Sequence, residues 1–131
     1  VVFHPGFDSP APYIPVAPPA RIRRVMDTFP TLKIVATHLG GWHDWENARR
    51  HLIGQPIYIE TSFSLHILPP DEARAMILAH PADRILFGTD SPWADPTAEL
   101  ARWRALNLPE DRLTAALGPN AARLLQSIPV P

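Results

Sequence analysis

The sequence predicts an α/β protein whose strands lie parallel in one sheet, and two observations lead to this fold class. Four short apolar runs rich in β-branched residues have the length of buried strands, at residues 1–4, 32–38, 57–61 and 84–90. Segments with helical spacing separate these runs. Regular alternation of strands and helices is typical of a parallel sheet.

The first two helices are predicted from apolar spacing and from a charge pair. Residues 42–53 form the weaker pattern, which a Glu46–Arg50 pair supports and Gly54 ends. The proline-rich segment 5–19 is predicted to be an ordered surface loop where the first strand ends. Residues 20–29 place four apolar side chains on one helical face: Ile22, Val25, Met26 and Phe29.

The later helices are marked by the residues at which they begin. Residues 95–106 start with an aspartate cap and a proline at the first helical position. Residues 109–126 predict two short helices that separate at Gly118-Pro119. Residues 71–80 follow two prolines and place four side chains on one face: Ala73, Met76, Ile77 and His80.

Composition and charge exclude several classes of protein. The 131 residues suit one domain with its own core, and 46% of them are apolar, too high a fraction for a disordered chain. A formal net charge of −1 offers no general basic surface for nucleic acid, and no apolar run reaches the length of a membrane span. The chain has no cysteine, which excludes disulfides and thiolate metal ligands. We therefore expect a cytoplasmic protein that binds a small molecule.

Polar residues stand where the predicted strands end. His4, His38, Glu60 and Asp90 lie at the ends of the four runs. In parallel α/β folds these C-terminal ends share one edge, where ligands bind. Imidazole and carboxylate groups together suit a catalytic divalent metal, with zinc the first choice and manganese the second. Such an ion lowers the pKa of bound water to about 7, and a neighbouring carboxylate or imidazole can then move the proton.

Both the fold and the role of these residues have an alternative. Four βα units form either half of a (β/α)8 barrel, which needs about 250 residues, or an open sheet of the flavodoxin type. A histidine at a strand end can be a satisfied polar residue, and Asp90 can cap the turn that follows it. A non-catalytic binding or assembly module is therefore the alternative to an enzyme.

Five motifs carry a family resemblance that covers nearly the whole chain. They are His4-Pro5-Gly6, Thr37-His38-Leu39-Gly40-Gly41, Tyr58-Ile59-Glu60-Thr61-Ser62, the segment 85–93 and the segment 117–125. In this order they resemble the C-terminal half of the amidohydrolase superfamily. The closest group is the amidohydrolase 2 family, which includes metal-dependent hydrolases and decarboxylases related to aminocarboxymuconate-semialdehyde decarboxylase. The resemblance implies that residues 1–131 are one partial domain: the last four βα units, strands five to eight, of a TIM (β/α)8 barrel plus C-terminal helices.

The resemblance also implies roles for single residues. His4 matches a metal-ligand histidine, and Asp90 matches an aspartate that is a metal ligand or a general base. His38 matches a histidine that binds the substrate or orients the attacking water. Trp93 and the segment 5–19 would then border the substrate pocket. Three further residues near the predicted edge are candidates for substrate contacts from their positions alone: Glu60, His43 and His66.

One feature of the family is missing from this sequence. The His-x-His pair that ends the first barrel strand and supplies two metal ligands does not occur. Because the chain also opens with a valine inside a strand, we expect a fragment of a longer protein or else a truncated homologue. A half barrel exposes its strand edges and inner face. The isolated chain should therefore be inactive and marginally stable, or pair with a second copy or with the other half.

The expected activity of the full-length protein is hydrolysis of an ester, lactone or amide-like bond by metal-activated water. Non-oxidative decarboxylation of a carboxylated ring or dienoate is the alternative within the same family. A truncated, non-catalytic remnant is the alternative of a different class.

Overall fold

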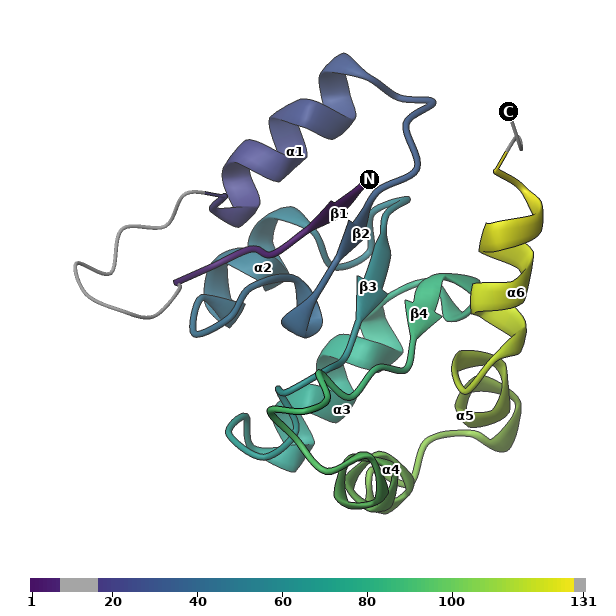
Figure 1. Cartoon of the computed structure of the whole chain (residues 1–131). Helices are drawn as coiled ribbons and strands as arrows, with labels where there is room; N and C mark the ends of the chain where they lie inside the picture. Colours follow the sequence, from purple (N-terminus) through teal and green to yellow (C-terminus); the bar gives the residue numbers. More distant parts are fainter. Residues whose placement is uncertain (8–16, 129–131) are drawn as a thin grey trace.

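A computed structural model describes residues 1–7 and 17–128 and confirms the parallel α/β fold (Figure 1). Its sheet has four strands in sequence order, and every neighbouring pair is parallel. The strands are β1 (Val2–Phe3), β2 (Val35–Ala36), β3 (Tyr58–Glu60) and β4 (Ile85–Leu86).

The strands are shorter than the apolar runs predicted. Hydrogen bonds extend the pairing of β1 with β2 beyond the strand bounds, since the amide of Thr37 donates to the carbonyl of Phe3 over 3.1 Å. The backbone then turns at once, because His38 has a φ of +54° and opens the short 3-10 helix η1 (His38–Gly40). Asp90, the last residue of the fourth predicted run, has a φ of +61°. β2 and β4 thus end before His38 and Asp90, the residues that carry chemical groups.

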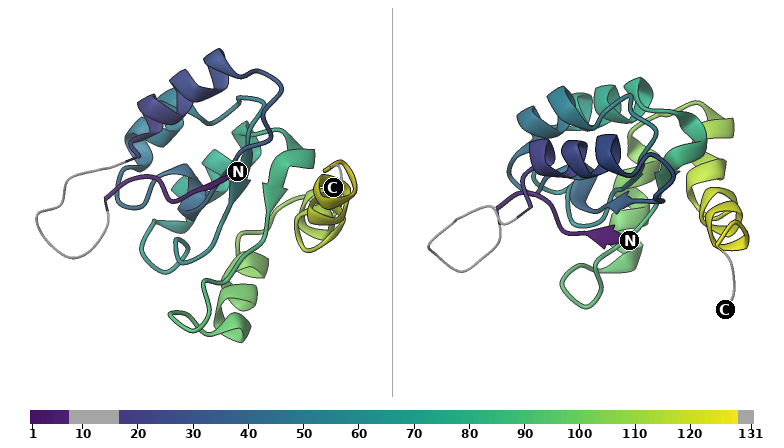
Figure 2. Two further views of the ribbon diagram at one scale, coloured as in Figure 1. Left: turned by 45° about the horizontal axis from the view of Figure 1, so that its top comes forward. Right: turned by 90° about the horizontal axis from the view of Figure 1, so that it is seen from above.

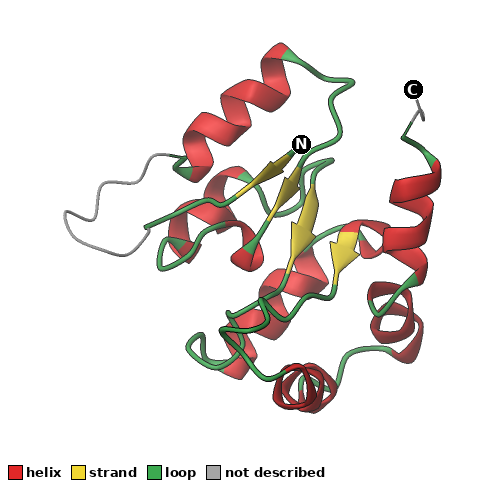
Figure 3. Ribbon diagram, in the orientation of Figure 1, coloured by secondary structure: helices red, strands yellow, loops and turns green. Residues whose placement is uncertain are grey.

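Within residues 1–7 and 17–128, six α-helices lie close to the predicted ranges (Figure 3). Four of them begin with a proline at the first position, which accounts for part of the high proline content. They are α1 (Pro19–Thr28), α2 (Trp45–His51), α3 (Pro70–Ala79), α4 (Pro96–Ala105), α5 (Glu110–Ala116) and α6 (Pro119–Gln126), and the 3-10 turn η2 (Ala82–Arg84) precedes β4.

One predicted helix signal is confirmed, and one predicted helix start is corrected. The carboxylate of Asp95 accepts a hydrogen bond from the amide of Thr97 over 3.0 Å, which is the predicted cap of α4. Helix α2 begins three residues later than predicted, because Trp42 pairs with Gly6 as a short parallel bridge. The predicted loop 5–19 lies largely in residues 8–16, outside the described residues.

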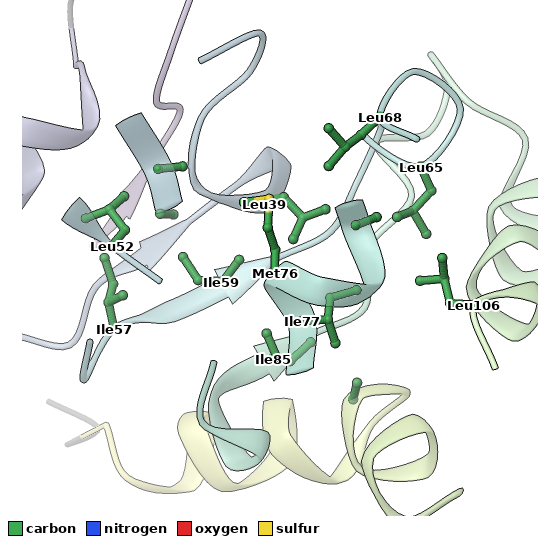
Figure 4. Packing of buried hydrophobic residues seen from close by; sticks show 14 of the residues in the cluster. Leu39, Leu52, Ile57, Ile59, Leu65, Leu68, Met76, Ile77, Ile85 and Leu106 are labelled. Carbon is green, nitrogen blue, oxygen red and sulfur yellow. The ribbon is translucent and has the colours of Figure 1, made fainter. Parts of the chain in front are cut away.

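The hydrophobic core lies between one face of the sheet and helices α1 to α3, and it extends to Trp103 of α4 and Ala116 of α5 (Figures 2 and 4). Ala36, Ile59 and Ile85 stand in one row across β2, β3 and β4, and none of them is exposed. Met76 and Ile77 of α3 cover this row and are equally buried, as the helical spacing predicts. Truncating a residue such as Ile59 to alanine would cost about 2–5 kcal/mol of unfolding free energy.

The imidazole of His80 joins α3 to the loop between α2 and β3. Its Nδ1 accepts a hydrogen bond from the amide of Gly54 over 3.1 Å, and Nε2 donates to the carbonyl of Ile57 over 2.8 Å. The side chain is 2% exposed. Burial lowers the pKa of His80 from its ordinary value of 6.5 to about 4, and the positive charges of Arg84 and Arg112 act in the same direction. His80 is therefore a neutral structural link.

The opposite face of the sheet opens into a groove of about 1140 Å³ that α6 borders. Among the described residues, nine large apolar side chains are exposed and six of them line this groove. The six are Val1, Val2, Phe29, Leu32, Leu125 and Ile128. Phe29 corrects one prediction, because it follows the end of α1 and is 57% exposed instead of packing with the inner face of that helix.

At one side of the sheet, β4 is held by the C-terminal helices. The amide group of Asn120 in α6 donates to the carbonyls of Ala82 and Ile85 over 2.8 and 2.7 Å. The amide of Phe87 donates to the carbonyl of Ala116 over 3.0 Å. None of the helices in residues 1–7 and 17–128 has the length and apolar character needed to cross a membrane.

We expect the stability of the chain to fall in acid because of His80. The neutral form is favoured in the fold, so the stabilisation is complete above pH 6.5 and is lost as the pH falls toward 4. The shift corresponds to about 3 kcal/mol of unfolding free energy between pH 7 and pH 4. Urea unfolding of the wild type and His80→Gln at both pH values measures this difference.

The matched control is His51→Gln, which changes a histidine of α2 outside this link and should keep the wild-type dependence. An equal loss of stability in wild type and His80→Gln would contradict the assignment.

Candidate functional site

The four strands end at one edge of the sheet, and the backbone there is unusually strained. Among the described residues, six non-glycine residues have a positive φ, and five of them lie in the segments that follow β2, β3 and β4. Such conformations cost about 1–3 kcal/mol each and concentrate at functional sites. The five are His38, Leu39, His43, Phe63 and Asp90.

The two histidines predicted at this edge lie together. The rings of His4 and His38 have centroids 4.5 Å apart and are tilted by 55°. His4 is exposed, whereas His38 is only 5% exposed. The carbonyl of His38 accepts a hydrogen bond from the indole nitrogen of Trp45 over 3.0 Å, which holds the backbone of the strained turn. The site therefore presents one accessible and one sheltered imidazole.

Glu60 joins this pair through Ser62, a residue that the sequence analysis did not select. The amide of Ser62 donates to Oε1 of Glu60 over 2.6 Å, and the hydroxyl of Ser62 donates to Oε2 over 2.7 Å. On its other side Ser62 lies next to His38, whose Nδ1 is 3.0 Å from the Ser62 carbonyl oxygen. The one signal that could have identified Ser62 is its position two residues after Glu60 in the sequence. The partner of Ser62 is 24 residues away, so local pattern could not reveal it.

Burial raises the pKa of Glu60 from its ordinary value of 4.5 to about 7. The hydrogen bonds from Ser62 act in the opposite direction, and the negative charge of Asp90 raises the pKa further. This electrostatic coupling places Asp90 within the field of the same site. A carboxyl group with a pKa near neutrality can hold or release a proton under ordinary conditions.

The backbone of the segment that follows β4 lies directly against Glu60 at Gly88. A Cβ atom at this glycine would lie 1.7 Å from Oε1 of Glu60, which no real contact permits. Any side chain at position 88 would displace the carboxyl group. Gly88 therefore provides the space for the Glu60 carboxyl group next to the segment that carries Asp90.

Aromatic rings form a wall beside the two histidines. Trp42 and Phe63 are stacked with centroids 5.0 Å apart and an interplanar angle of 25°. The ring of His66 lies 4.3 Å from that of Phe63, and the ring of His43 lies 4.6 Å from that of Trp42. His38 connects this aromatic wall to the site, since its ring is 5.5 Å from Trp42. Partial burial lowers the pKa of His66, and the buried carboxylate of Glu99 opposes this effect.

The structure thus brings most of the predicted residues to one edge. His4, His38, Glu60 and Asp90 form its polar part, while His43 and His66 belong to the aromatic wall. Trp93 is different, because its side chain is 77% exposed and only its amide, which donates to the carbonyl of Asp90 over 2.8 Å, connects it to the site.

The described residues do not by themselves complete a metal site. In the part of the chain that the structure describes, no group of three or more histidine, aspartate or glutamate side chains could hold a metal ion together. A catalytic zinc site takes three protein ligands and one open position. His4 and Asp90 each carry a donor atom of a type that zinc accepts.

The fold and the site define a class of protein: βα units of a parallel barrel that carry an imidazole and carboxylate site at the C-terminal ends of their strands. The sequence profile of the family described as amidohydrolase, the amidohydrolase 2 family, matches residues 1–126. The chain therefore belongs to the amidohydrolase 2 family. Among curated protein sequences, none matches it.

Solved structures similar to this chain include enzymes of two kinds. The 2,6-dihydroxybenzoate decarboxylase from Rhizobium has a TM-score of 0.66 and 18% identity, over 95% of this chain and 50% of that one. A dihydroxybenzoic acid decarboxylase from Polaromonas sp. JS666, with bound manganese and 2-nitroresorcinol, has a TM-score of 0.63 and 19% identity, over 82% and 38%. An amidohydrolase from Burkholderia multivorans with bound zinc has a TM-score of 0.59 and 18% identity, over 80% and 48%.

The chain spans about half the length of the first of these structures. These comparisons confirm the prediction of half a TIM barrel. At 18–19% identity, these similarities show the fold of the chain.

We predict that the carboxyl group of Glu60 titrates near pH 7. Replacing Ser62 with alanine removes a hydrogen bond that lowers the pKa of Glu60, so the midpoint in Ser62→Ala should move further upward. The measurement is a titration of the side-chain carboxyl carbon by NMR, with Glu60→Gln to identify the signal. A wild-type midpoint at the ordinary value of 4.5 would contradict the buried geometry of this group.

Proposed function

We propose that the complete protein is a metal-dependent, non-oxidative decarboxylase of small aromatic carboxylates. The observation that carries this proposal is the aromatic wall of Trp42, Phe63 and His66 next to the imidazoles of His4 and His38. A planar ring can stack on such a wall while its carboxylate faces the polar groups. The two dihydroxybenzoate decarboxylases among the similar structures support this reaction over hydrolysis, which reverses the order expected from the sequence.

The reaction needs one proton at a ring carbon and the loss of one carbon dioxide. The ring carbon that bears the carboxylate gains a proton, the bond to the carboxylate carbon breaks, and its electron pair returns to the ring. His38 or Asp90 moves the proton, because both stand at the edge where the substrate would lie. Glu60, His43, His66 and Trp93 are proposed to contact the substrate around them.

His4 and Asp90 would hold a divalent ion, manganese or zinc, together with ligands from outside the described residues. When bound, the ion would offset the negative charge of the substrate. Its positive charge would also relieve the repulsion between Glu60 and Asp90, which contributes to the raised pKa of Glu60.

We propose that the groove, on the face of the sheet opposite the core, is the interior of a complete barrel. Its lining is mostly apolar, and the similar structures contain about as much chain again as this one. A second set of four βα units would cover Val2 and Leu125, and it would bring further ligands to the polar end of the groove at Glu60. A second copy of this chain is the alternative occupant.

Hydrolysis of an ester, lactone or amide-like bond is the second candidate function. The zinc-bound amidohydrolase among the similar structures supports it. The two reactions are distinguished by their products, because only decarboxylation releases carbon dioxide. A protein that binds a dihydroxybenzoate without converting it would favour the non-catalytic alternative.

We expect the polypeptide that carries both barrel halves to release carbon dioxide from 2,6-dihydroxybenzoate or a related hydroxybenzoate. Replacing His38 with glutamine should lower kcat by roughly 100-fold or more, the usual effect of losing a group that transfers protons. His4→Ala should lower the content of bound manganese or zinc, measured by elemental analysis. His51→Gln, in α2 outside the site, is the matched control and should change neither quantity.

Full activity in His38→Gln would exclude a catalytic role for this imidazole, and release of product without carbon dioxide would support hydrolysis.

The barrel interior is tested by placing a charge in the groove. Val2 is 68% exposed in this chain, so Val2→Glu should change the unfolding free energy of the isolated chain by less than about 0.5 kcal/mol. In the complete barrel the same charge would be buried and should cost several kcal/mol. Thermal or urea unfolding of both forms measures the difference, with Ile67→Glu, exposed outside the groove, as the control. Equal effects of Val2→Glu in the two forms would show that the groove stays open.

A further inference from the structure

The hydrogen bonds around Nδ1 of His38 define which ring nitrogen carries the hydrogen. Nδ1 lies 3.0 Å from the carbonyl oxygen of Ser62 and 3.3 Å from its hydroxyl oxygen. A carbonyl oxygen can only accept a hydrogen bond, so the shorter of these contacts requires the hydrogen to be on Nδ1. Both residues are 5% exposed, and water therefore has little access to compete for these bonds.

The hydroxyl of Ser62 supports the same assignment because Glu60 takes its single hydrogen. The hydroxyl donates to Oε2 of Glu60 over 2.7 Å, and the amide of Ser62 donates to Oε1 over 2.6 Å. With its hydrogen directed at the carboxylate, the hydroxyl oxygen faces His38 with its lone pairs. Both neighbours of Nδ1 are then acceptors.

Glu60 is itself fixed in this orientation. Its carboxyl group accepts a hydrogen bond from the backbone of His38. Gly88 lies directly against this carboxyl group and has no side chain that could displace it. The ring of His38 is held between the rings of His4 and Trp42, at centroid distances of 4.5 and 5.5 Å. The four groups form one connected arrangement.

We propose that Ser62 and Glu60 are positioning residues that hold His38 as the Nδ1–H tautomer, with the lone pair on Nε2. The tautomer follows from this geometry alone, while its meaning for catalysis rests on the proposed function. A neutral imidazole with its lone pair on Nε2 accepts a hydrogen bond or a proton from a substrate hydroxyl or from water. His38 would then be the acceptor among the polar groups of the site.

The first test is the tautomer of His38 in the full 131-residue chain, labelled with 15N in its histidines, at pH 8. Long-range proton–nitrogen NMR spectra distinguish a ring nitrogen that carries hydrogen from one that carries a lone pair. We expect hydrogen on Nδ1 and a lone pair on Nε2. Hydrogen on Nε2 would overturn the proposal, and this measurement needs no variant.

The second test reverses the polarity of the hydroxyl. In Glu60→Gln, the side-chain oxygen still accepts the hydrogen bond from the amide of Ser62. The new NH2 group therefore faces the hydroxyl oxygen of Ser62 and donates a hydrogen bond to it. The hydroxyl hydrogen is then directed toward Nδ1 of His38, and the share of the Nε2–H tautomer should rise. An unchanged tautomer in Glu60→Gln would exclude a role for Glu60.

A double variant and a control separate this effect from a general disturbance. In Ser62→Ala/Glu60→Gln the hydroxyl is absent, but the backbone carbonyl of residue 62 still accepts a hydrogen bond from Nδ1 of His38. The Nδ1–H tautomer should therefore return. Glu46→Gln, an exposed change of the same kind in α2, should leave the spectrum of His38 unchanged. Failure of the double variant to restore the tautomer would contradict the proposed path through the hydroxyl. If the tautomer is as expected but no carbon dioxide is released by the complete protein, the proposed function fails and the positioning role stands.

Discussion

Parallel pairing of the four strands is the constraint on which the rest of the molecule depends. Because neighbouring strands run in one direction, their C-terminal ends meet at a single edge. This edge, formed by the strand ends and the segments that follow them, brings together His4, His38, Glu60 and Asp90. The same register sends one row of side chains into the core beneath α1 to α3 and the alternate row into the groove. Core, groove and site therefore all depend on the parallel arrangement of the strands, which Figure 1 shows.

Much of the fold and part of the site could be predicted from the sequence, because both depend on local periodicity. The buried Met76 and Ile77 follow helical spacing, and the histidines and acids stand where apolar runs end. The contact of Ser62 with His38 joins residues far apart in the chain, so no local pattern contains it. The exposure of Phe29 has a different cause: helical spacing identifies an apolar side chain but not whether anything covers it.

The site combines groups that stabilise one another with groups that do not. Ser62 satisfies both oxygens of Glu60, yet burial and the charge of Asp90 favour the protonated carboxyl group. Strained backbone at His38 and Asp90 adds to this unfavourable energy. Such an arrangement is expected where function rather than stability determines the residues, and a bound cation would be the simplest way to offset the two neighbouring carboxylates. The four strands and the segments that follow them supply one part of this site: His4, His38, Glu60 and Asp90.

The proposed function requires that His4, His38 and Asp90 surround one position at this edge. The most direct measurement adds substoichiometric Mn²⁺ to the 15N-labelled chain and records which signals the paramagnetic ion broadens first. We expect early loss of the signals of His4, His38 and Asp90, with those of His51 and the C-terminal helices unaffected at the same concentration. Uniform broadening, or broadening centred on other residues, would contradict a shared cation position.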